Sequence, residues 1–152
     1  MTHHHDDIAH LFVYGTLIPG QRNWPLIEEL IAPDPIHGAC ARGWRMWHVG
    51  ADYPTITPAD PKHTVRGTLL RIAPDARHEL LELCDDLEGH TPGSDDNYYE
   101  RVAAPIEQAP GGPTHSAWLY HWTPARLQAT KVRLTEVPGG DWVRWRTRGE
   151  VS

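Results

Sequence analysis

One segment of this chain has the period of an α-helix, and almost every other apolar run is short. Between residues 74 and 87 the apolar side chains recur on one helical face, which holds Ala76, Leu80, Leu83, Cys84 and Leu87. Gly89 suits the position just past the end of this helix. A shorter helix is expected after Asn23, a plausible N-cap, and it should end before Pro33.

The short apolar runs predict strands. Residues 11–14 form such a run and end at a turn with Gly15, whereas residues 36–49 fit either one long bent strand or a hairpin. Further strands are expected at residues 63–72, 99–106 and 117–122, the second of them interrupted by Pro105. Dominant strands with two helices between them predict an α+β fold, with a curved or closed sheet and helices packed outside it.

The chain shows no internal repeat and no long linker, so residues 9–152 are expected to form a single domain. Residues 1–8 read as a flexible, His-rich tail, and its histidines are left out of the site argument. No signal-peptide pattern or membrane-length apolar run occurs, and Cys40 and Cys84 lack a C-x-x-C spacing. We therefore expect a cytoplasmic protein with two reduced core thiols.

Charge excludes one class of partner. The chain has 20 Asp and Glu against 14 Lys and Arg, and its basic residues are scattered apart from a short C-terminal cluster. Nucleic-acid binding normally needs a clustered basic surface, so no nucleic-acid partner is expected. No membrane partner is expected either, and a homodimer stays open.

Glu88 is the first candidate for chemistry. On the helical wheel it lies on the flank of the apolar stripe beside Cys84, whereas Glu82, Asp85 and Asp86 fall on the solvent side. Partial burial at the negative end of a helix disfavours the ionised carboxylate, which should raise the pKa of Glu88 and make it a stronger base. The alternative is an ordinary, solvated residue at a helix end.

A second candidate is the segment from Tyr14 to Gly20, directly after a predicted strand. Gly15 and Gly20 permit sharp backbone turns, and consecutive exposed N–H groups in such a turn can bind an anion. A carboxylate or a phosphate would fit, although neither G-x-G-x-x-G nor the Walker A pattern is present. The alternative is a plain turn in which Thr16 bonds its own backbone.

Other chemistries find little support in the sequence. The histidines between residues 37 and 121 show no zinc-binding spacing, so neither a metal nor another cofactor is expected. Ser94 and Ser116 lack a nucleophile elbow, and the place of Cys84 on the apolar stripe favours packing over nucleophilic attack.

Taken together, these pieces resemble the γ-glutamyl cyclotransferase superfamily, including its AIG2-like and butirosin-pathway branches. The matching motifs run in the family's order from about residue 11 to residue 145. They are Phe12-Val13-Tyr14-Gly15-Thr16-Leu17, Asn23, Tyr53-Pro54, Asp85-Asp86-Leu87-Glu88-Gly89, Tyr99-Glu100-Arg101 and Trp118-Leu119-Tyr120. Each motif is weak alone, and their combined order and spacing make the resemblance specific.

The resemblance implies a small mixed β-barrel with flanking helices and a substrate pocket at one mouth of the barrel. It implies that the backbone of Tyr14, Gly15, Thr16 and Leu17 binds the α-carboxylate of a γ-glutamyl group. Glu88 would accept a proton from the α-amine, which closes the 5-oxoproline ring, and would then protonate the departing amine. Tyr53, Pro54 and Tyr99 would line the pocket. Arg101 would support the nearby loop or pair with Asp85.

Two rival functions remain, a small-molecule binding module without turnover and a γ-glutamyl amide hydrolase that activates water. The leaving group also stays open among glutathione, γ-glutamyl amino acids, γ-glutamyl amines and a γ-glutamylated natural product. Its end of the pocket is expected to be shaped by residues 90–97, together with Trp24, Trp44 and Trp47.

Overall fold

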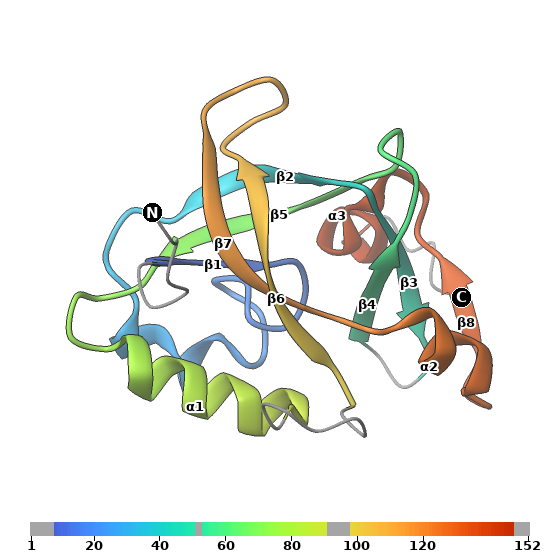
Figure 1. Cartoon of the computed structure of the whole chain (residues 1–152), viewed down its shortest axis with the longest axis horizontal. Helices are drawn as coiled ribbons and strands as arrows, with labels where there is room; N and C mark the ends of the chain where they lie inside the picture. The colour runs from blue at the N-terminus through green and yellow to red at the C-terminus, as the bar shows by residue number, and fades with distance from the viewer. Residues whose placement is uncertain (1–7, 51–52, 91–97, 148–152) are drawn as a thin grey trace, which may run out of the picture.

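The computed structural model describes residues 8–50, 53–90 and 98–147, which form a closed five-stranded barrel beside a smaller three-stranded sheet (Figure 1). The barrel strands, in spatial order, are β1 (His10–Val13), β5 (Thr64–Arg71), β2 (Ile36–Arg42), β6 (Glu100–Glu107) and β7 (Thr114–His121). Neighbouring strands are antiparallel except β1 and β7, whose parallel contact at Leu11 and Trp118 closes the barrel. The α+β fold with a small mixed barrel is thus confirmed.

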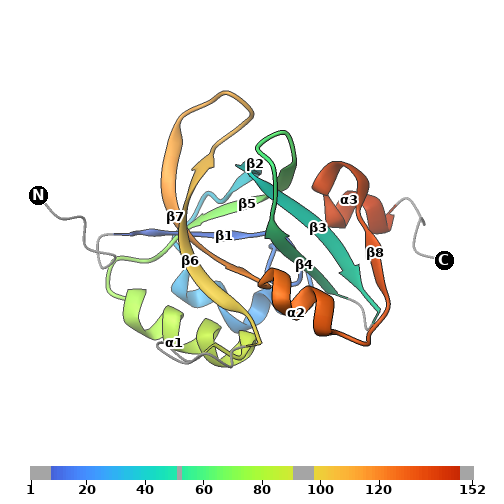
Figure 2. The ribbon, with the colours of Figure 1, turned by 45° about the vertical axis from the view of Figure 1, so that its right-hand side comes forward.

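The second sheet has the order β4 (Tyr53–Pro58), β3 (Trp44–Val49) and β8 (Leu134–Glu136). Figures 1 and 2 place it at one end of the barrel, together with α2 (Pro124–Ala129) and α3 (Trp142–Thr147). Trp142 and Trp145 of α3 are buried, and the Trp142 indole donates a hydrogen bond to Nδ1 of His48 on β3 at 3.0 Å. This contact holds α3 against the sheet.

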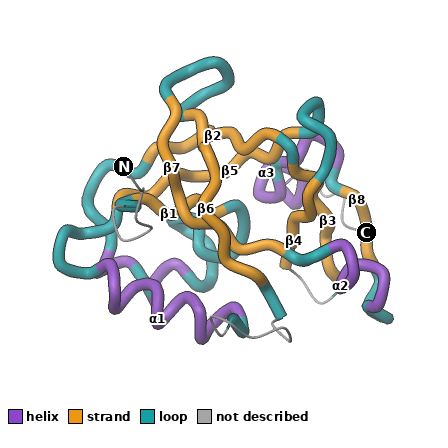
Figure 3. Tube along the Cα trace, viewed as in Figure 1, coloured by secondary structure: helices purple, strands orange, loops and turns teal. Residues whose placement is uncertain are grey.

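Both faces of β1 are buried, because alternate side chains of a strand point to opposite sides. Leu11 and Val13 belong to a core shared with Leu80 of α1 (Arg77–Glu88), whereas Phe12 belongs to a core shared with Trp142 of α3. In Figure 3, the strands occupy the middle of the molecule and α1 covers the barrel from outside. The segment that follows β1 is therefore held between two cores.

The helix α1 ends where the sequence predicts, at Glu88, with Gly89 in the left-handed conformation (φ 68°). Leu80 and Cys84 are buried as expected, but Leu87 is 39 % exposed. Asp85, expected on the solvent side, is only 9 % exposed. The wheel prediction for Asp85 is wrong because barrel residues far along the chain supply polar partners for it, as described below.

The segment after Asn23 forms two 3₁₀ turns, Trp24–Leu26 and Glu28–Leu30, instead of the expected helix. The Asn23 side chain makes no capping hydrogen bond, because its amide donates to Oγ1 of Thr16 instead, at 3.0 Å. Without the cap, and with Pro25 early in the segment, only single turns form.

Two strand predictions also need correction. Residues 36–49 form neither a hairpin nor one long strand: β2 and β3 belong to different sheets and are separated by Gly43 (φ 89°). Pro105 does not interrupt β6, where it lies opposite Ser116 of β7. Within the described strands, β2 pairs with β6 only at Glu107, so Pro105 has one neighbouring strand and its missing N–H is tolerated.

Most of the predicted His-rich tail lies outside the described residues, but Ile8 is 8 % exposed and packs into the core. Cys40 and Cys84 are both buried free thiols. In the described segments, no helix has the length and apolar character needed to cross a membrane.

Candidate active site

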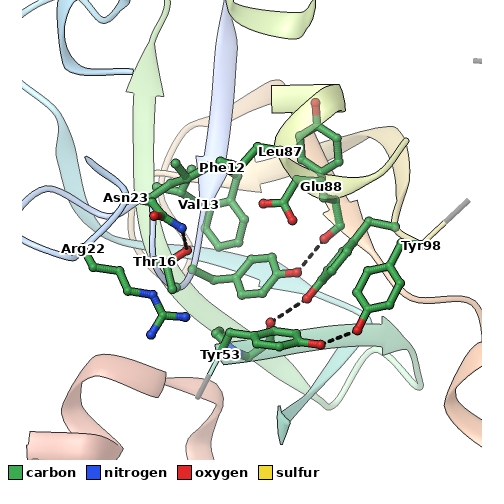
Figure 4. Close-up of a pocket in the computed structure, with 15 residues that line it drawn as sticks. Phe12, Val13, Thr16, Arg22, Asn23, Tyr53, Leu87, Glu88 and Tyr98 are labelled. Carbon is green, nitrogen blue, oxygen red and sulfur yellow. Dashed lines mark hydrogen bonds between the residues drawn. The ribbon is translucent and has the colours of Figure 1, made fainter. Parts of the chain in front are cut away.

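A pocket of about 340 Å³ lies where the barrel, α1 and the second sheet meet (Figure 4). Its walls come from the end of β1 and the turn after it, the start of β4, the last turn of α1, the residues entering β6, and β7. All the residues predicted for the site line it, namely Tyr14, Gly15, Thr16, Leu17, Tyr53, Pro54, Glu88 and Tyr99. Segments up to 108 positions apart, as Phe12 and Tyr120 are, thus meet at one place.

The turn after β1 is held by its own backbone and by Asn23. The Ile18 N–H donates to the carbonyl of Gly15 at 3.1 Å, and the Asn23 N–H donates to the carbonyl of Thr16 at 2.9 Å. Thr16 therefore pairs with Asn23 instead of with its own backbone. Within the described residues, the N–H groups of Gly15, Thr16 and Leu17 donate to no protein acceptor, which leaves them available to a bound anion.

Gly15 is required for a different reason from the one expected. Its φ is not positive, so the turn itself does not demand glycine. A Cβ at this position would lie 2.5 Å from Cγ of Pro54, far inside contact distance. Gly15 thus lets β4 approach the turn closely, whereas Gly20 (φ 93°) is the turn glycine that the sequence predicts.

The carboxyl group of Glu88 lies among the pocket side chains in Figure 4. Burial raises the pKa of Glu88 from its ordinary value of 4.5 to about 7. The raised pKa agrees in direction with the sequence expectation, and removal from water, one of the two features expected to raise it, is its cause. Near neutral pH, such a carboxyl group is populated as both acid and base, which suits proton transfer in both directions.

Tyrosines surround this carboxyl group and remain protonated. Burial, followed by nearby negative charges that include Glu88, raises the pKa values of Tyr14 and Tyr99 well above the ordinary value. The Tyr99 hydroxyl donates to the carbonyl of Pro54 at 2.9 Å, and the Tyr14 hydroxyl donates to the carbonyl of Tyr120 at 2.6 Å. Because both hydroxyl groups already donate hydrogen bonds within the protein, the two rings mainly determine the shape of the pocket.

The family model described as "Gamma-glutamyl cyclotransferase, AIG2-like" matches residues 11–144, the range that contains all of these residues. The chain belongs to this family. No curated protein matches the chain.

Solved structures share the cyclotransferase-family fold at low sequence identity. An AIG2-like protein from Mus musculus is 24 % identical with a TM-score of 0.57, over 82 % of this chain and 84 % of that one. An Arabidopsis thaliana protein is 22 % identical with a TM-score of 0.62, over 99 % and 79 %. YkqA from Bacillus subtilis is 20 % identical with a TM-score of 0.60, over 95 % and 43 %, so this chain spans less than half of YkqA.

The pocket of this family member also contains residues that sequence reasoning missed. Arg22, Leu87 and Tyr98 line it, and the Tyr98 hydroxyl is hydrogen-bonded to that of Tyr53. The guanidinium of Arg126 on α2 lies 4.5 Å from the centre of the Tyr98 ring. The position of Arg22 between Gly20 and Asn23 was the only local signal for it. No motif pointed to Tyr98 except its neighbour Tyr99.

The tryptophans expected near a leaving group do not lie in the pocket. None of Trp24, Trp44 and Trp47 lines the pocket, because Trp24 packs against the α1 core and the other two lie on β3. Residues 91–97 of the expected loop lie outside the described part of the chain. Among the described residues, no group of three or more His, Cys, Asp or Glu side chains is arranged to hold a metal ion.

Proposed function

We propose that the protein is a γ-glutamyl cyclotransferase, which releases 5-oxoproline and a free amine from a γ-glutamyl amine or peptide, with Glu88 as general acid and base. The observation that carries the proposal is a carboxyl group with a pKa of about 7 inside the pocket of a family member. The backbone N–H groups of the turn after β1 support it, because they offer a site for the substrate's α-carboxylate.

In the proposed mechanism, the turn formed by Tyr14 to Leu17 holds the α-carboxylate and directs the α-amine towards Glu88. Ionised Glu88 accepts a proton from the amine, whose nitrogen then attacks the γ-carbonyl carbon. A new C–N bond closes the five-membered lactam, and the bond to the leaving nitrogen breaks as Glu88 returns its proton to that nitrogen. Because attack occurs within one molecule, its effective molarity is high and no protein nucleophile is needed.

The first test of this proposal is a panel of glutathione, γ-glutamyl amino acids and γ-glutamyl amines, with 5-oxoproline detected by mass spectrometry. We expect stoichiometric 5-oxoproline and free amine from at least one member of the panel. Binding without any turnover across the panel would instead favour a binding module.

A second test separates the cyclotransferase from a hydrolase that uses the same pocket. In water labelled with oxygen-18, ring closure by the α-amine gives unlabelled 5-oxoproline, because water never attacks the γ-carbonyl. A hydrolase would release glutamate that carries the label in its γ-carboxylate, without prior 5-oxoproline. That product would replace the proposed reaction with hydrolysis.

A further inference from the structure

Asp85 lies one helical turn before Glu88 and is buried, with three hydrogen bonds to its carboxylate. Oδ1 accepts from Nε of Arg101 at 2.8 Å and from the hydroxyl of Tyr120 at 2.6 Å. Oδ2 accepts from Nη2 of Arg101 at 3.2 Å. A buried carboxylate with this many partners is held in one orientation.

The two partners of Asp85 come from neighbouring strands of the barrel. Arg101 on β6 and Tyr120 on β7 face each other directly in the strand register, so they form one cross-strand pair. The Arg101 guanidinium also lies 4.4 Å from the centre of the Trp118 ring, which fixes its plane. Asp85 is therefore attached to the rigid barrel wall at a single point.

The contact between Asp85 and the barrel is also connected to the two parts of the proposed site, which are the turn after β1 and the end of α1. The carbonyl of Tyr120 accepts from the Tyr14 hydroxyl at 2.6 Å, at the start of the turn after β1. On the helix side, the His90 N–H donates to the carbonyl of Asp85 at 2.7 Å, so the chain around Glu88 closes back onto Asp85. Moving Asp85 away from the wall would move the last turn of α1, and Glu88 with it.

We propose that Asp85 is a positioning residue for Glu88: its bonds to Arg101 and Tyr120 hold the end of α1 against the barrel, so that the Glu88 carboxyl stays inside the pocket. The kinetic consequence of this inference rests on the proposed function, but the structural consequence does not. A buried ion pair by itself adds little stability, since desolvation offsets the attraction between the charges. Placement of Glu88 gives this pair a role beyond stability.

The titration of Glu88 reports its position, because burial alone raises its pKa to about 7. If the end of α1 moves outwards, Glu88 becomes hydrated and its pKa falls towards the ordinary value. Among the described residues, five ionisable groups around Glu88 have raised pKa values, and a further tyrosine, Tyr98, lines the same pocket. The five are Cys84 on α1, Tyr14 after β1, Tyr53 on β4, Tyr99 before β6 and Tyr120 on β7. Arg22 also lines the pocket. The Glu88 resonance is assigned among the 20 Asp and Glu carboxyl groups by its absence from the spectrum of Glu88→Gln.

The experiment compares Asp85→Asn and Tyr120→Phe with wild type and with Asp86→Asn, which makes the same charge change on the exposed neighbouring residue. Tyr120→Phe removes one hydrogen bond to Asp85 and leaves both its charge and the Tyr120 carbonyl in place. The Glu88 carboxyl is titrated by carbon-13 NMR in each folded protein. Turnover is measured in parallel, with kcat and KM determined separately.

We expect the pKa of Glu88 to fall by about one unit or more in Asp85→Asn and Tyr120→Phe, and to stay near 7 in Asp86→Asn. Turnover should fall about tenfold to 100-fold in kcat, with KM within about threefold of wild type, because the turn after β1 is intact. If Asp85→Asn does not fold, Tyr120→Phe and Arg101→Lys carry the test. Arg101→Lys keeps the charge, loses the two-pronged geometry and should also lower the pKa.

An unchanged Glu88 pKa and kcat in folded Asp85→Asn and Tyr120→Phe, whatever the loss of thermal stability, would overturn the positioning role while leaving the cyclotransferase proposal in place. Conversely, a wild-type protein that shows no turnover but shows the expected fall in pKa in both variants would retain the positioning role and remove the proposed reaction.

Discussion

At the scale of single residues, the site depends on one carboxyl group, Glu88, which in the proposed mechanism acts first as a base and then as an acid. Glu88→Gln keeps the shape of the side chain but cannot accept a proton, so kcat should fall at least about 100-fold in a folded protein. In wild type, kcat/KM should rise with pH up to about 7, because only ionised Glu88 acts as the base. Steady-state kinetics across pH check both, with Asp86→Asn as the mild control. Near-normal turnover by folded Glu88→Gln would remove Glu88 from the mechanism.

The raised pKa of Glu88 also makes a prediction about stability. The folded protein holds this proton up to about pH 7, whereas the unfolded chain releases it near 4.5. The folded state therefore binds more protons over this interval, and stability falls as pH rises through it. At pH 8, the free energy of unfolding of Glu88→Gln should exceed that of wild type by about 1–3 kcal/mol. Near pH 5 this difference should be much smaller. Urea unfolding at the two pH values measures the difference, and an equal gap at both would show that Glu88 is not desolvated.

At the scale of elements, the turn after β1 is shaped by its contact with β4. Gly15→Val would press a side chain into Pro54, where even a Cβ would lie 2.5 Å from Cγ, and so displace the N–H groups of the turn. We expect KM to rise at least about tenfold for Gly15→Val. Thr16→Ala loses only the hydrogen bond from Asn23, worth about 1 kcal/mol of stability, and should change KM little. Kinetics and 5-oxoproline binding distinguish the two, and equal small effects would place the α-carboxylate elsewhere.

At the scale of the whole molecule, the pocket exists because the barrel and the second sheet are packed against each other, with Tyr53 and Pro54 supplied by β4 and Glu88 supplied by α1 (Figures 2 and 4). Gly140, just before α3, lies against β5 of the barrel, and a Cβ there would be 2.1 Å from the carbonyl oxygen of Thr64. Gly139 has a similar positive φ but nothing within 4 Å of such an atom.

These two glycines give a matched pair of variants. Gly139→Ala should cost about 1 kcal/mol, from backbone strain alone. Gly140→Ala adds a clash with barrel backbone and should cost at least about 3 kcal/mol, with weaker 5-oxoproline binding as the two units separate. Urea unfolding and a binding titration measure the two effects. If the two variants lose the same free energy of unfolding, the backbone around Gly140 can move to accommodate the added Cβ.

The sequence alone determined the features that depend on neighbours along the chain. The apolar period of residues 74–87 predicted α1 and its end, although the helix begins at Arg77 and not at Pro74, and it placed Glu88 at the edge of the buried stripe. The run before Gly15 predicted a strand and a turn, and the order of the motifs indicated the family and hence the barrel. These predictions succeeded because helical period, turn chemistry and motif spacing are local properties.

Only the tertiary structure decided which distant residues meet. A helical wheel put Asp85 in solvent, because it does not include Arg101 and Tyr120, which lie 16 and 35 positions away. The hydrogen bonds from these two residues offset the cost of burying the carboxylate. The same limit hid the contact of Gly15 with Pro54, and the place of Arg22 and Tyr98 in the pocket. The physical reason is that burying a polar or charged group costs free energy unless its partners are present, and only strand pairing and the packing of α1 on the barrel bring those partners together.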